Sequence, residues 1–139
     1  MLQRDYLSKI IESFTKQMEV YLKDAVILRK TESIGEVEEA LGELLELDPD
    51  MLLSLSPDSL VTMIALGGNG DALGDSVAYV LARLGDAEAQ RGDKETAALR
   101  RQQARAVALG FGFNNQIVPE QFKDLDKEIQ DARAQGRFI

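Results

Sequence analysis

Cysteine, histidine and tryptophan are absent from this sequence of 139 residues, and only three prolines occur. Without cysteine, the chain has no disulfide framework, no thiolate metal ligand and no cysteine nucleophile. Without histidine, it lacks the commonest metal ligand, the usual general base of serine hydrolases and the usual pH switch. An enzyme of this composition would have to use carboxylates, Lys, Arg, Ser or Tyr. Because aromatic residues are enriched in strands, their 6% share favours a helical protein.

Long apolar runs are also missing. The longest, Leu60 to Leu66, is interrupted by Thr62 and is far too short to cross a bilayer. The first residues include Gln3, Arg4 and Asp5, so no apolar core of a secretory signal is visible. We therefore expect a cytoplasmic protein without membrane association. The length predicts a single helical domain over residues 1–139.

Basic residues are missing from one long segment. Residues 31–82 carry eleven acids and no base, whereas residues 1–30 sum to +2 and residues 83–139 to +1, which gives the net charge of −8. Such a chain is a poor candidate for nucleic-acid binding. A solvated acidic face that aids solubility is the favoured interpretation of the acidic segment.

The most informative stretch runs from Leu73 to Leu109 and predicts two helices folded back at Gly92. Gly92 suits the left-handed position that ends a helix, while Asp71 and Asp93 are candidate N-caps. The second arm is rich in alanine, so it can approach the first closely. Apolar residues recur at helical spacing in the first arm: Leu73, Val77, Val80, Leu81, Leu84 and Ala87.

Small residues in this hairpin carry a family resemblance. Leu84-Gly85, Gly92-Asp93, Ala97 and Ala104 together resemble the tetratricopeptide-repeat signature. In that family Leu and Gly lie midway along the first helix, a Gly forms the turn and two Ala line the second helix. The sequence departs from the signature at Glu88, Arg101 and Leu109, where the family prefers two aromatics and a proline. A generic antiparallel helix pair with small residues at its crossing explains the same pattern.

The opening of the chain carries a second resemblance. Met1 to Tyr6, followed by Ile10, Ile11 and Phe14, is similar to the start of a family of small uncharacterised bacterial proteins, helical and tetratricopeptide-like. Residues 44–49, LLELDP, resemble the end of a second tetratricopeptide helix. These resemblances imply a helical fold and no assigned activity.

Further helices are predicted on both sides of the hairpin. An amphipathic helix covers residues 2–28, and the capping-box pattern of Ser33 and Glu36 predicts another from about 34 to 47. Asp48-Pro49 and Ser56-Pro57 open helices over residues 50–55 and 58–66. Pro119 begins a last helix that ends at Gly136, after a linker anchored by Phe111, Phe113, Ile117 and Val118. We expect an all-α fold of about seven helices, with antiparallel pairs in a short tetratricopeptide-like solenoid or bundle.

Four groups of residues are candidate sites. Gly68-Asn69-Gly70 with Gly74 is a near-miss to a dinucleotide loop, but no buried strand precedes it, so we favour a turn. Two acidic groups are candidate ligands of a hard cation such as Mg²⁺ or Ca²⁺, but they have no recognised ion-loop spacing and are interpreted as helix-end charges and solvated faces. They are Asp71 with Asp75, and Asp124 with Asp126, Glu128 and Asp131. A basic group is expected to pair within the molecule, with the acidic residues 31–50, or between subunits, and the alternative is that it binds an acidic partner: Arg91, Lys94, Arg100, Arg101 and Arg105.

The tetratricopeptide resemblance also implies a protein-binding groove at Tyr79, Ala82, Asp86 and Gln90, whose spacing forms one stripe on a helix. A basic or neutral segment would bind there, with Tyr79 as its anchor and Asp86 as its charge partner. Alternatively, Tyr79 packs against a neighbouring helix and Asp86 is only solvated.

The expected function is a small interaction or adaptor module without a cofactor, which binds another protein or itself as a homo-oligomer. Self-association is expected because too few helix pairs are present to cover both ends of a solenoid. The alternative is a carboxylate-based enzyme, with or without a divalent metal.

Overall fold

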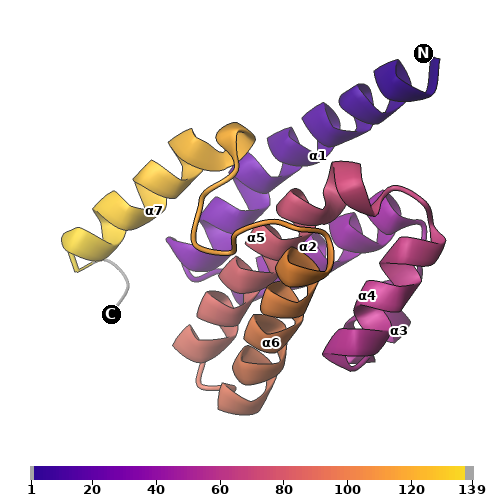
Figure 1. Cartoon of the computed structure of the whole chain (residues 1–139). Coiled ribbons are helices and arrows are strands. Elements are labelled where there is room, and N and C mark those ends of the chain that lie inside the picture. The colour runs from indigo at the N-terminus through magenta and orange to yellow at the C-terminus, as the bar shows by residue number, and fades with distance from the viewer. Residues whose placement is uncertain (1, 137–139) are drawn as a thin grey trace.

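The structure, a computed structural model, describes residues 2–136, and this part of the chain is helical without any strand. It contains seven α-helices and one 3-10 turn (Figure 1). The all-α prediction is therefore confirmed. The elements are α1 (Leu2–Val26), α2 (Thr31–Leu45), α3 (Pro49–Ser54), α4 (Pro57–Leu66), α5 (Gly70–Gln90), α6 (Lys94–Gly110), η1 (Glu120–Phe122) and α7 (Lys123–Ala134).

Helix α5 lies at the centre and contacts α1, α2 and α6. Its contact with α6 is the most extensive between any two elements, and the two helices run side by side from the turn at Gly92 (Figure 1). The six apolar residues predicted for the inner face of the first arm are all buried. They pack with the inner faces of α1 and α2, chiefly Phe14, Met18, Leu22, Val26, Val37 and Leu41.

Three predicted helix starts are confirmed by side-chain caps. Asp48 accepts a hydrogen bond from the Met51 amide at 3.0 Å, and Ser56 accepts one from the Ser59 amide at 3.3 Å. Asp93 accepts from both the amide and the hydroxyl of Thr96, at 3.0 and 2.8 Å. Each cap satisfies a backbone donor that has no partner within its helix. Gly92 has the expected left-handed backbone, with φ of 91°.

Two other predicted caps were wrong. Helix α2 begins at Thr31 with Lys30 at its N-cap, and Ser33 is buried inside the first turn, where its side chain packs in the core and does not cap the helix. Helix α5 begins at Gly70, so Asp71 lies in its first turn. There the carboxylate complements the positive end of the helix dipole without capping a backbone donor.

Several helix boundaries also differ from the prediction. Helix α1 ends at Val26 instead of residue 28, and α2 ends at Leu45 because Glu46 adopts a left-handed conformation with φ of 56°. Pro119 precedes the 3-10 turn η1, and the last α-helix begins only at Lys123. Helix ends are set by single backbone conformations that periodicity does not encode.

Two glycines of α5 allow the linker that follows α6 to pack closely against this helix. A Cβ on Gly70 would overlap the Phe111 ring, and one on Gly74 would lie 3.0 Å from Phe113 Cε2. Gly70 and Gly74 thus make room for two aromatic rings. This packing role agrees with the prediction that residues 68–74 are not a dinucleotide-binding loop. Phe111 and Phe113 anchor the linker as predicted, whereas Ile117 is 67% exposed and does not.

Helix α3 is fastened to α6 by hydrogen bonds from buried polar side chains. Arg100 Nη1 donates to the Leu53 carbonyl at 2.8 Å, and Gln103 Nε2 donates to the carbonyls of Leu53 and Leu55 at 3.2 and 3.0 Å. These carbonyls lie at the end of α3, where no intrahelical donor reaches them. The two side chains therefore act as a C-terminal cap supplied by another helix. None of the helices described has the length and apolarity needed to span a membrane.

Candidate functional site

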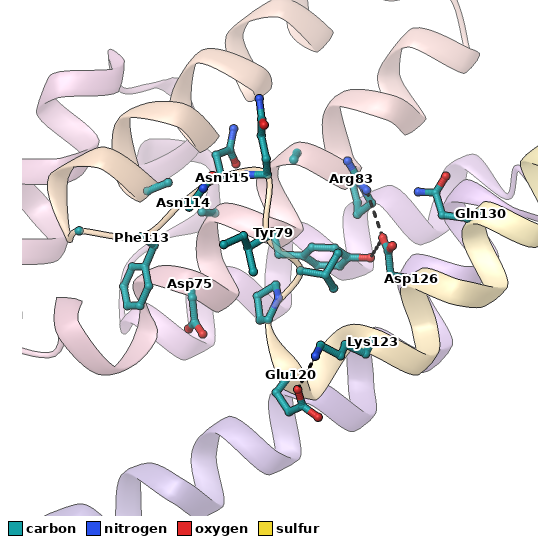
Figure 2. A pocket seen from close by; sticks show the side chains of 18 residues that line it. Asp75, Tyr79, Arg83, Phe113, Asn114, Asn115, Glu120, Lys123, Asp126 and Gln130 are labelled. Carbon is teal, nitrogen blue, oxygen red and sulfur yellow. Dashed lines mark hydrogen bonds and ion pairs between the residues drawn. The ribbon is translucent and has the colours of Figure 1, made fainter.

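A cleft of about 870 Å³ lies between α5, the linker at residues 112–119 and the first turns of α7 (Figure 2). This volume is within the range of ligand-binding pockets. Small side chains from α5 and α6, among them Ala78, Ala82 and Ala108, line it together with Phe113 and Val118. Polar side chains complete the lining: Asp75, Arg83, Asn114, Asn115, Gln116, Glu120, Lys123, Asp126 and Gln130.

Tyr79 forms the wall of the cleft where α5 meets η1 and α7. Its ring is 8% exposed and stacks on Phe122, with centroids 4.8 Å apart and an interplanar angle of 13°. Its hydroxyl donates to Asp126 Oδ1 at 2.7 Å, and the Arg83 guanidinium lies 5.2 Å from the ring centroid (Figure 2). The position of Tyr79 agrees with the alternative hypothesis, in which this residue packs against a neighbouring helix.

The environment of Tyr79 keeps its phenol protonated. Burial raises the pKa of Tyr79 far above its ordinary value of 10.0, and the adjacent Asp126 carboxylate raises it further. Both effects disfavour the phenolate, because it would be a poorly solvated charge beside another negative charge. Tyr79 is therefore a neutral hydrogen-bond donor, and it is unsuited to proton abstraction near neutral pH.

Asp86 is the centre of a three-helix cluster of charges. Its carboxylate lies 3.0 Å from Arg83 Nε of α5, 3.2 Å from Arg101 Nη2 of α6 and 3.5 Å from Arg133 Nη2 of α7. The Asp86 side chain is only 14% exposed. The Asp86 carboxylate is thus paired with arginines of three helices and not merely solvated.

The four residues of the predicted groove are divided by the fold. Tyr79 and Ala82 line the cleft, whereas Asp86 and Gln90 lie outside its lining. Both polar atoms of the Gln90 side-chain amide are buried without a hydrogen-bond partner among the described residues. Arg83, Asp126 and Gln130 belong to the cleft although the sequence did not point to them as groove residues. Asp126 lies 47 positions from Tyr79, and no local pattern links the two.

The acidic groups weighed as cation ligands are dispersed. Within residues 2–136 no three carboxylates come together in a way that could hold a metal ion. Asp126 is engaged by Tyr79 and lies 3.4 Å from Arg83 Nη1, and Asp131 pairs with Lys127 at 3.0 Å. Asp71 is exposed at the start of α5.

A second cluster of buried charges lies between α2, α5 and α6. Arg100 Nη2 lies 3.7 Å from Glu38 Oε2, so the expected pairing of the basic group with the acidic segment is found here. Burial raises the pKa of Glu38, while the Arg100 charge opposes the rise. Glu88 is 2% exposed and pairs with Arg91. The members of this cluster join helices and line no part of the cleft beside Tyr79.

Comparison of the chain with protein-family models, curated proteins and solved structures finds no match in any of the three. The functional argument therefore depends on the geometry of the cleft.

Proposed function

We propose that this protein is a small interaction module of tetratricopeptide-like design, which binds an extended segment of another protein in the cleft beside Tyr79. In this proposal its helices form antiparallel pairs, and the cleft takes the place of the groove inferred from the sequence. The observation that carries the proposal is the combination of small floor residues with an amide-rich rim in one cavity of about 870 Å³.

The rim is suited to a peptide backbone. Asn115 and Gln130 lie on opposite sides of the cleft (Figure 2), and their side chains form no hydrogen bond to another described residue. A side-chain amide both donates and accepts, as does each peptide group of an extended segment. Such contacts supply affinity for the backbone and leave sequence preference to the side-chain pockets.

The floor is suited to close approach. Ala78, Ala82 and Ala108 leave space that larger side chains would fill, and Tyr79 supplies a rigid aromatic wall. The carboxylates of Asp126 and Glu120 are already paired with Arg83 and Lys123. No specific observation in the cleft favours the alternative of a carboxylate-based enzyme.

The experiment is a selection of random short peptides displayed on phage, followed by affinity measurement on the purified protein. Ala82→Phe places a ring in the cleft, and Ala89→Phe, on an exposed position of the same helix, is the matched control. Selected peptides should bind Ala82→Phe at least roughly tenfold more weakly than the wild type, because the ring blocks the floor of the cleft. Their affinity for Ala89→Phe should equal that for the wild type. Failure to select any binder, or equal binding to both variants, would overturn the proposal.

Self-association remains an expectation alongside this function. Large apolar side chains are exposed on four helices, just after α1 and in the linker that follows α6. They are Tyr6 and Val20 on α1, Leu28 just after it, Met51 on α3, Leu66 on α4, Leu109 on α6 and Ile117 in the linker. Sedimentation equilibrium at high micromolar concentration tests it, and a strict monomer would contradict it.

A further inference from the structure

The charges that line the cleft do not cancel, and the imbalance lies at Asp75. Arg83 lies 3.4 Å from Asp126, and Lys123 lies 2.8 Å from Glu120, so both cations of the lining are engaged. Asp75 is the remaining acid. Its carboxylate accepts a hydrogen bond from the Ser76 amide at 2.7 Å, and no described cation lies within ion-pair distance of it.

Asp75 lies next to an aromatic surface. The ring of Phe113 packs against Gly74, where a Cβ would lie only 3.0 Å from Phe113 Cε2, and this places the ring beside the turn of α5 that carries Asp75. Figure 2 shows both side chains at the same end of the cleft, away from Asp126 and Gln130. Phe113 and Asp75 are each half-buried, so both present part of their surface to the cleft.

From this arrangement we propose that the Asp75 end of the cleft receives an arginine or lysine side chain of the bound segment. The inference rests on the proposed peptide-binding function and names the chemistry of its ligand. The cation pairs with the Asp75 carboxylate, while the aliphatic stem or the guanidinium plane lies on the Phe113 ring. Arginine fits better than lysine, because its planar group stacks on a ring and donates to a carboxylate at the same time.

The rest of the molecule favours the same ligand. The chain carries a net charge of −8, and residues 31–82, which include Asp75, hold eleven acids and no base. A field of this sign attracts basic segments and speeds their encounter with the protein, while the local contacts decide where they bind.

The test uses two small probes that share a shape. N-acetyl-arginine amide carries the cation, and N-acetyl-citrulline amide is its neutral counterpart. Each is titrated into ¹⁵N-labelled protein while amide chemical shifts are recorded. The arginine probe should shift the amides of Asp75, Ser76 and Phe113 and bind roughly threefold to tenfold more tightly than the citrulline probe, in line with a partly exposed ion pair assisted by a ring.

Two substitutions make the result specific. Asp75→Asn should abolish the difference between the probes, whereas Asp71→Asn removes an exposed acid from the same helix and should leave the difference intact. Equal binding of the two probes would overturn the inference, as would shifts spread evenly over all acidic surfaces. If displayed peptides bind and respond to Ala82→Phe but show no enrichment in basic residues, the inference fails while the proposed function stands.

Discussion

The hydroxyl of Tyr79 donates a hydrogen bond to Asp126 Oδ1 over 2.7 Å and so joins α5 to α7 across 47 positions of sequence. The same tyrosine stacks on Phe122 at the start of the C-terminal segment. One side chain thus supplies an apolar contact to η1 and a polar contact to α7. This pairing turns the predicted open groove into a cleft that α7 closes on one side.

Replacement of Tyr79 with phenylalanine tests the polar half of this contact. Tyr79→Phe keeps the stack on Phe122 but removes a hydrogen bond to a charged group, so the free energy of unfolding should fall by about 1.5 kcal/mol. Urea denaturation measures the change. Tyr21→Phe is the control, since the hydroxyl of Tyr21 forms no hydrogen bond among the described residues. An equal fall in the free energy of unfolding in both variants would show that the hydrogen bond to Asp126 contributes no stability.

The charge cluster around Asp86 should contribute more stability than an ordinary surface ion pair. Asp86→Ala removes the carboxylate that Arg83, Arg101 and Arg133 share and should cost about 2 kcal/mol. Glu12→Ala, which breaks the exposed Lys16–Glu12 pair, should change stability by less than about 0.5 kcal/mol. Denaturation in low and high salt measures both, and equal small effects would contradict the assignment.

Two helical glycines should respond with opposite signs to alanine. A Cβ on Gly85 would lie 2.8 Å from Arg101 Cγ and 3.3 Å from the Ala97 carbonyl oxygen, so Gly85→Ala should destabilise the α5–α6 crossing by about 1–3 kcal/mol. A Cβ on Gly35 meets no atom within 4 Å, so Gly35→Ala in α2 should stabilise the protein by about 0.5–1 kcal/mol. Thermal denaturation of the two variants measures both changes. A higher melting temperature for Gly85→Ala would contradict the close approach of α5 and α6 at this residue.

Loss of the C-terminal cap that α6 supplies should destabilise α3. Gln103→Leu keeps much of the side-chain volume, but it removes the side-chain donor of the Leu55 carbonyl and leaves the Leu53 carbonyl with Arg100 alone, at a cost of about 1–3 kcal/mol. Gln102→Leu, on the exposed face of the same helix, should be nearly neutral. Hydrogen exchange should show faster exchange of α3 amides in Gln103→Leu alone. Unchanged protection of α3 in that variant would disprove the role of the cap.

The Asp93 cap predicts a pH dependence of known sign. Hydrogen bonds from the amide and then the hydroxyl of Thr96 lower the pKa of Asp93 below its ordinary value of 3.8. A lowered pKa in the folded state means that the stabilisation is present above pH 3.8 and is lost as the pH falls through the folded value.

The matched variant is Asp93→Asn, which can still cap but does not titrate. The wild type should lose stability relative to Asp93→Asn only below about pH 4, and acid denaturation of both proteins measures the difference. The raised pKa of Glu38 is common to both proteins and cancels. A constant difference over the whole acid range would contradict the proposed linkage.

The sequence was sufficient for features that depend on local spacing. The buried face of α5 follows from apolar residues three and four apart, and the starts of α3, α4 and α6 follow from cap residues. The start of α2 was missed because Ser33 fits both a cap and a small core residue. The Tyr79–Asp126 contact was missed because it depends on where α7 packs. The spacing of apolar residues in α7 indicates which face is buried but not which helix covers that face.

Helix α3 has six residues, too few to persist as an isolated helix, and its end is capped by Arg100, 47 positions further along the chain. During synthesis, α3 therefore leaves the ribosome well before the side chains that cap it exist. At ordinary elongation rates this interval is roughly 2–10 s. For that time the apolar side chains of Leu52 and Leu53 have no completed core to enter, so the segment between α2 and α5 stays exposed on the nascent chain.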